Sequence, residues 1–95
     1  MNKINAQKMY TFYEIINDFN RIRILVCLNS EEMTVDKISK ITNLNVTTIS
    51  SQLAYLRDYK IVKKINYENE ITYKICDKYI LKIIDSIIKY ISVSN

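Results

Sequence analysis

The sequence contains no glycine, no proline and no histidine. Without glycine it cannot form the glycine-rich loops that bind phosphates in P-loop and dinucleotide-binding proteins. Without histidine it has no Ser-His-Asp triad, no Cys-His pair and no ordinary zinc-hydrolase site. These absences argue against an enzyme, and they leave no catalytic residue and no cofactor to propose.

Long apolar runs are also missing. No run approaches the roughly 20 residues of a membrane-spanning helix, and the N-terminal residues lack the apolar stretch of a signal peptide. The 95 residues carry a net charge of +4, a mildly basic balance that permits nucleic-acid binding. We therefore expect a single domain over residues 1–95 that is cytoplasmic and has no membrane partner.

The sequence does contain segments in which apolar residues recur at the spacing of a helix or of a strand. Alternating residues over two short segments around residues 68–70 predict a β-hairpin, which would form the wing of a winged helix-turn-helix. The expected fold is therefore mostly α with a small β-hairpin. Helical spacing predicts its helices over residues 5–17, 21–28, 34–42, 45–58 and 78–93.

Local signals sharpen two of these elements. Asparagine tolerates positive φ, so we expect left-handed residues at Asn43, between the third and fourth helices, and at Asn69, in the hairpin turn. Thr34 and Asn45 are the expected N-caps of those two helices. The third helix is expected to bury Val35, Ile38 and Ile41.

The helix over residues 45–58 is the most informative element. Ile49, Leu53 and Leu56 form one narrow apolar stripe, which leaves the other side free to read base edges in a major groove. Gln52 is the expected base reader because its amide can bond an adenine bidentately, and Ser50 is expected at a phosphate or its own backbone. The alternative is an ordinary solvated surface. Expected DNA contacts are Thr47, Thr48, Ser50, Ser51, Gln52 and Tyr55, with Lys37, Lys40, Arg57, Lys63 and Lys64 along the phosphates.

The last helix is apolar on nearly every side. A short chain offers only one core, so such a helix must bury its far side against another molecule, and a second copy is the expected partner. The expected homodimer interface comprises Met9, Phe12, Tyr13 and Ile16 from the first helix and Ile80, Ile84, Ile87, Ile88 and Ile91 from the last.

At this point the chain resembles the ArsR/SmtB family of winged-helix repressors over residues 8–92. Residues 18–25 (Asp-Phe-Asn-Arg-Ile-Arg-Ile-Leu) are similar to the family's D-P-x-R-L-x-I-L, and residues 44–56 to its L-S-x-S-T-V-S-x-H-L-x-x-L. Residues 59–62 stand for A-G-L-V and residues 72–75 for Y-Y-x-L. The resemblance implies a homodimeric repressor that pairs through its first and last helices and binds double-stranded DNA at a palindromic operator.

The chain departs from the family at its signal sites. Residues 34–36 (Thr-Val-Asp) replace the family's C-x-C pair, and histidine ligands are absent, so no metal site is expected. Some relatives sense persulfides or oxidants with a cysteine pair, which makes Cys27 and Cys76 candidate thiol sensors. The simpler interpretation is two free cysteines acting as small hydrophobes. The inducer is left open.

The wing departs as well. Glu68 and Glu70 flank Asn69 at its tip, and carboxylates there would repel phosphates. Two alternatives to a simple repressor therefore stay open. One is a winged-helix module that binds a protein and no longer binds DNA, and the other is a thiol-responsive repressor.

Overall fold

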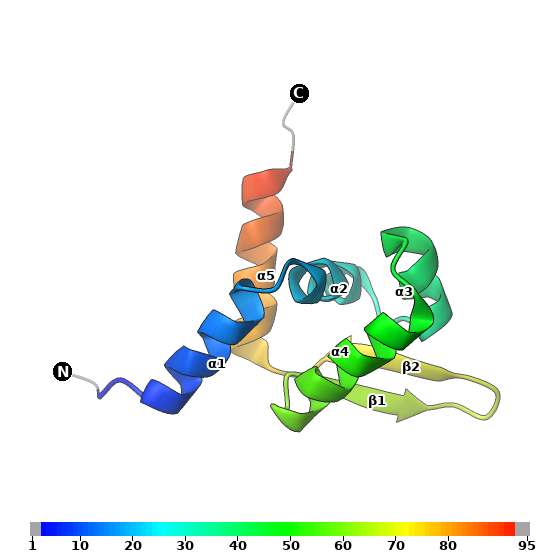
Figure 1. The fold of residues 1–95 in the computed structure, drawn as a ribbon, viewed down its shortest axis with the longest axis horizontal. Helices are drawn as coiled ribbons and strands as arrows, with labels where there is room; N and C mark the ends of the chain where they lie inside the picture. The colour runs from blue at the N-terminus through cyan, green and yellow to red at the C-terminus, as the bar shows by residue number, and fades with distance from the viewer. Residues whose placement is uncertain (1–2, 93–95) are drawn as a thin grey trace.

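The computed structural model describes residues 3–92. Within that range the chain forms a helical body from which one antiparallel hairpin extends, with the wing tip at one end and α1 and α5 toward the other (Figure 1). The winged helix-turn-helix order expected from the sequence is confirmed. The elements are α1 (Ala6–Ile16), α2 (Phe19–Ser30), α3 (Val35–Thr42), α4 (Val46–Asp58), β1 (Val62–Asn66), β2 (Ile71–Ile75) and α5 (Lys78–Ile91).

Short polar side chains begin the helices. The predicted caps Thr34 and Asn45 are confirmed, since they accept from the backbone N–H of the third residue beyond them, at 3.1 and 2.8 Å. Asp18 caps α2 in the same way, and the helix therefore begins at Phe19 rather than at Arg21, where its apolar pattern begins. The last helix, expected over residues 78–93, ends at Ile91 with Ser92 as its C-cap, and residue 93 lies outside the described residues.

Of the two residues predicted to be left-handed, one is and the other is not. Asn43 has φ of 66°, so its predicted role between α3 and α4 is confirmed. The prediction for Asn69 is wrong, because the non-glycine residues with positive φ among residues 3–92 are Asn43 and Lys60. Lys60 takes the tight turn from α4 into β1 instead, and the hairpin closes with Tyr67 N–H donating to the Glu70 carbonyl at 2.8 Å.

The core lies where α2, α4 and the base of the hairpin meet. Ile49, Leu53 and Leu56 of α4 are fully buried, which confirms the stripe expected from the sequence. Ile41 is 56% exposed, so the expectation that the third helix buries it is wrong. The buried apolar residues are Ile15, Ile24, Leu25, Cys27, Leu28, Met33, Ile38, Ile49, Leu53, Leu56, Ile61, Val62, Ile75 and Ile84.

The hairpin is fixed to the body through the middle of β2. Met33, in the segment before α3, forms an antiparallel bridge with Tyr73 of β2, with N–H···O distances of 3.1 and 2.8 Å. The strand register pairs Lys63 with Lys74 and Lys64 with Tyr73. No helix within residues 3–92 is long and apolar enough to cross a membrane.

Candidate nucleic-acid interface

The outward face of α4 carries short side chains. Thr47, Ser50 and Ser51 are exposed, as expected, while Thr48 is half-buried beside the Asn45 cap. Because the buried stripe fixes the opposite side of the helix, these hydroxyl groups are held on a rigid element. They point away from the core and are free to bond a ligand in a groove.

Gln52 differs from this expectation. Its Oε1 accepts from Nε of Arg21 at 2.7 Å, and its Nε2 donates to Oδ2 of Asp18 at 3.2 Å. Both ends of the amide are therefore engaged inside the protein, and the side chain is half-buried. A side chain in this state is not free for bidentate contact with a base.

Tyr55 is also tied to the body. Its ring lies under the guanidinium of Arg21, 3.6 Å from Cζ to the ring centroid, and packs 4.8 Å from the Tyr59 ring. Burial is the largest cause that raises the pKa of Tyr55, and the charge of Arg21 opposes it. The sequence did not predict that Asp18 and Arg21 contact the side chains of α4. Their Asp-x-x-Arg spacing places the two side chains within 3.8 Å of each other at the start of α2, but it does not identify Gln52 and Tyr55 as their partners.

The α3–α4 turn is held by a second set of bonds. Oγ of Ser39 donates to the Leu44 carbonyl at 2.7 Å, and the Leu44 N–H donates to Oγ1 of Thr42 at 3.2 Å. Arg23 of α2 donates to the Thr42 carbonyl. The start of α4 is thereby fixed relative to α3.

The candidate phosphate contacts are not equivalent. Lys40, Arg57, Lys63 and Lys64 are exposed, whereas Lys37 forms an ion pair with Glu31. Because alternate residues of a strand leave opposite faces, Lys63 and Lys64 point to opposite sides of the hairpin. They cannot both contact the same stretch of phosphates from one face.

The two faces of the hairpin can be told apart by their neighbours. Lys64 lies on the face of its partner Tyr73, which lines a groove together with Thr34 and Asp36 at the start of α3. Lys63 lies on the face of Lys74, which lines a groove with Leu28 of α2 and Leu81 of α5. Lys64 is therefore the lysine on the side of the helix-turn-helix.

The wing tip is acidic and exposed. Glu68, Asn69 and Glu70 all lie open to solvent. Next to them, the hydroxyl of Tyr67 donates to the carboxylate of Glu32, and this hydrogen bond is the largest cause that raises the pKa of Tyr67. The bond ties the end of β1 to the loop before α3.

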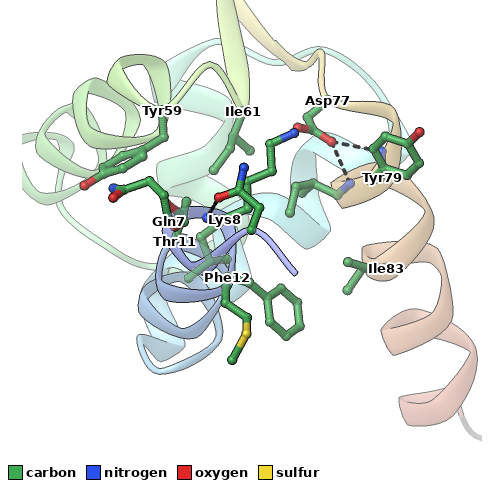
Figure 2. A pocket seen from close by; sticks show the side chains of 13 residues that line it. Gln7, Lys8, Thr11, Phe12, Tyr59, Ile61, Asp77, Tyr79 and Ile83 are labelled. Carbon is green, nitrogen blue, oxygen red and sulfur yellow. Dashed lines mark hydrogen bonds between the residues drawn. The ribbon is translucent and has the colours of Figure 1, made fainter. Parts of the chain in front are cut away.

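An apolar groove of about 630 Å³ lies between α1 and α5 and reaches the end of α4. Figure 2 shows Phe12 of α1 and Ile83 of α5 on its two sides, with Tyr59 at the α4 end. Of the expected interface residues, Met9, Phe12, Tyr13, Ile16 and Ile91 are exposed, and Ile80, Ile87 and Ile88 are half-buried. The prediction that Ile84 lies at the dimer interface is wrong, because the residue is 2% exposed and belongs to the core of its own protomer.

The two cysteines lie in different environments. Cys27 is buried in α2, and burial raises the pKa of its thiol. Cys76 is exposed, and its Sγ lies 3.4 Å from the Lys60 carbonyl oxygen. Over residues 3–92 there is no group of three or more His, Cys, Asp or Glu side chains that could hold a metal ion.

Helices α3 and α4 joined at Asn43, followed by a hairpin and a final helix, define a winged helix-turn-helix of the DNA-binding class. The model of bacterial regulatory proteins of the arsR family matches residues 18–64. The chain belongs to the ArsR family of transcriptional regulators, which are not enzymes.

Known proteins agree with this assignment. A transcriptional repressor SmtB homolog from Synechocystis sp. is 22% identical over the whole of this chain and 72% of its own length. Reduced HlyU from Vibrio cholerae superposes with a TM-score of 0.85 at 20% identity, covering 94% of each chain. A homodimeric winged helix-turn-helix domain from Mycobacterium bovis, a possible ArsR-family regulator, superposes with a TM-score of 0.72 at 20% identity, covering 95% of this chain and 89% of that one.

Proposed function

We propose that this protein is a homodimeric repressor that binds a palindromic operator in double-stranded DNA. The observation that carries the proposal is the outward face of α4. Thr47, Ser50 and Ser51 stand exposed on a helix whose opposite side is fully buried, which is the arrangement that a recognition helix needs in a major groove. Half-sites are expected about one DNA turn apart, roughly 34 Å, because a two-fold dimer presents two such helices.

The groove between α1 and α5 supports the dimer. Met9, which lines the groove, is 61% exposed, and Ile91 at the far end of α5 is 57% exposed. Large exposed apolar residues on two neighbouring helices are typical of an interface, and a second copy supplies matching apolar helices. The homodimeric relative from Mycobacterium bovis is consistent with this arrangement.

The phosphate contacts are assigned to the exposed cations on the side of α4. Lys40, Arg57 and Lys64 are retained as backbone contacts, while Lys37 is partly neutralised by Glu31. Thr48 remains a proposed contact because the residue is half-buried rather than buried. Gln52 and Tyr55 are reassigned from base contact to support of α4, because their side chains are bound to Arg21. We also propose that the protein acts in the cytoplasm, where a regulator of the bacterial arsR family would meet its DNA.

We propose that repression is not controlled by a metal. The sequence lacks histidine, and the described part of the chain holds no cluster of candidate ligands. A thiol-controlled repressor is a second form of the same function. The exposure of Cys76 favours it, and the burial of Cys27 opposes a direct pair.

The test is an electrophoretic mobility shift with the DNA upstream of the protein's own gene, titrated with salt under reductant and under oxidant. A specific shift that weakens with salt is the expected result, since cations release counterions from the phosphates. Loss of that shift on oxidation, with its return on reduction, would identify the thiol-responsive form.

A second candidate function is a protein-interaction module that keeps the winged helix and no longer binds DNA. The acidic, exposed wing tip at Glu68 and Glu70 favours it. No shift at low salt in either redox state, for any duplex, is the result that would establish this alternative over the repressor.

A further inference from the structure

Arg21 of α2 contacts two other helices, α1 and α4, from one position. Its Nε donates to Gln52 of α4, and its Nη1 donates to the backbone carbonyl of Glu14 in α1 at 2.9 Å. The flat guanidinium also covers the ring of Tyr55, on the next turn of α4. The side chain is only 14% exposed, so these contacts occupy most of its surface.

Acidic groups surround the same guanidinium. Oε2 of Glu14 lies 3.7 Å from Nη1, and Oδ2 of Asp18 lies 3.8 Å from Nε. Asp18 also accepts from Gln52, so Asp18, Arg21 and Gln52 form a closed ring of polar contacts. We name these three residues, with Glu14 and Tyr55, the Arg21 cluster.

The cluster connects two surfaces with different proposed roles. Helix α1 carries one side of the apolar groove, through Met9 and Phe12, and α4 carries the exposed hydroxyl groups. The planar fork of an arginine donates in fixed directions, so it sets the relative orientation of the groups that it bonds. A lysine, with a single point charge on a flexible stem, cannot do this.

We propose that Arg21 and Gln52 are positioning residues that hold the recognition helix α4 at a fixed orientation to the dimer helix α1. This inference rests on the proposed function. Dimer assembly and operator binding are then coupled, because each favours the same placement of α1 against α4. Thermodynamic linkage requires the coupling to be reciprocal, so operator DNA tightens the dimer as much as dimerisation tightens DNA binding.

The competing role for Arg21 is a direct phosphate contact, and its contacts argue against it. Its Nε donates to Gln52 and its Nη1 donates to the Glu14 carbonyl, so two of its three nitrogens already donate hydrogen bonds inside the protein. Two carboxylates within 4 Å further offset the charge that a phosphate would meet. The two roles predict different salt dependence, and that difference makes the proposal testable.

The experiment compares full-length wild type with Arg21→Met, Arg21→Lys, Gln52→Met and the double variant Arg21→Met with Gln52→Met. Each is titrated against the duplex that wild type selects from a random pool and against a random duplex, over a range of salt. Circular dichroism and thermal melting confirm that each variant folds. Gln52→Met preserves length and helix propensity, so the test survives if Arg21→Met does not fold.

The expected result is a selective loss. Operator affinity falls about tenfold or more in each single variant, while affinity for the random duplex and the slope against salt stay unchanged. The double variant is no weaker than Arg21→Met alone, because both remove one shared contact. Arg21→Lys does not rescue binding, and operator DNA tightens the dimers of these variants less than that of wild type.

Other outcomes overturn the inference. A salt slope that drops by about one in Arg21→Met, together with rescue by Arg21→Lys, would identify a phosphate contact instead. Unchanged discrimination between operator and random duplex in both single variants would sink the positioning role while leaving the repressor intact. If wild type binds no duplex at all, the proposed function itself fails, which is a distinct result.

Discussion

Arg23 of α2 donates from Nη2 to the backbone carbonyl of Thr42, the last residue of α3. The last carbonyls of a helix have no partner within the helix, and this guanidinium supplies one at the entrance to the helix-turn-helix turn. Asn43 follows in the left-handed conformation, so the bond lies at the point where the chain changes direction.

Replacing Arg23 should therefore destabilise the fold. Arg23→Met is expected to lower the free energy of unfolding by about 1.5–3 kcal/mol, the usual range for a hydrogen bond to a charged group. Urea denaturation followed by circular dichroism measures the change. Arg57→Met is the matched control, because Arg57 is exposed on α4 and its loss should change stability by no more than about 0.5 kcal/mol. Equal effects for the two variants would show that the Thr42 bond adds nothing.

The two adjacent lysines of β1 should differ in DNA binding. Lys64 lies on the face of the hairpin that borders α3, so Lys64→Ala should weaken binding to operator and random duplexes alike and lower the salt slope by about 0.9. Lys63 faces the other way, and Lys63→Ala should leave binding nearly unchanged. It should even stabilise the fold by a few tenths of a kcal/mol, since it removes a like charge directly opposite Lys74. Salt titrations by fluorescence anisotropy separate the two, and equal losses would mean that the wing approaches DNA from both sides.

The face of α4 predicts how it reads DNA. From Val46 to Ala54 its exposed positions carry methyl and hydroxyl groups and no cation or free amide, so bidentate contact with guanine or adenine is not available there. Val46, which is 47% exposed, is suited to pack on thymine methyl groups.

Replacing thymine by uracil in the selected operator removes only those methyl groups. Each thymine under α4 should then contribute about 0.8 kcal/mol, or about fourfold in affinity, as expected for one buried carbon. Val46→Ala should reduce the sensitivity to uracil at one base pair and leave the others unchanged. An operator that binds equally well with uracil throughout would exclude readout through methyl groups.

The sequence predicts the elements of this protein better than their contacts. The buried stripe of Ile49, Leu53 and Leu56 can be predicted from helical periodicity alone. The left-handed conformation of Asn43 can be predicted from the backbone preference of asparagine alone. Gln52 was misjudged because its partners Asp18 and Arg21 lie 34 and 31 residues away in the chain. Nothing in local sequence shows that the start of α2 packs against the middle of α4.

The cysteines should react in a fixed order. Thiolates are the reactive form, and burial raises the pKa of Cys27, so its thiol stays protonated to higher pH than that of an ordinary cysteine. Cys76 is exposed. We expect Ellman's reagent to modify one thiol per chain in the native protein between pH 7 and 8, and two after denaturation. The variants Cys76→Ser and Cys27→Ser assign the reactive thiol, and fast native reaction of the Cys76→Ser variant would show that Cys27 is accessible after all.

Substitutions on the two sides of α5 should have different effects, one on the folding stability of the protomer and the other on the stability of the dimer. Ile84 is 2% exposed in the protomer core, so Ile84→Ala is expected to cost about 2–5 kcal/mol of folding stability. Ile91 is 57% exposed, so Ile91→Asp should leave the protomer folded and weaken the dimer by about 2 kcal/mol or more, roughly thirtyfold. Ile71→Asp, at a 42% exposed position on the wing, is the control for adding a charge to exposed apolar surface.

Sedimentation equilibrium gives the dissociation constants of the dimers, and circular dichroism shows whether each variant folds. A dimer that tolerates Ile91→Asp as well as Ile71→Asp would place the interface away from the end of α5, because a carboxylate buried in an apolar seam without a partner is strongly unfavourable.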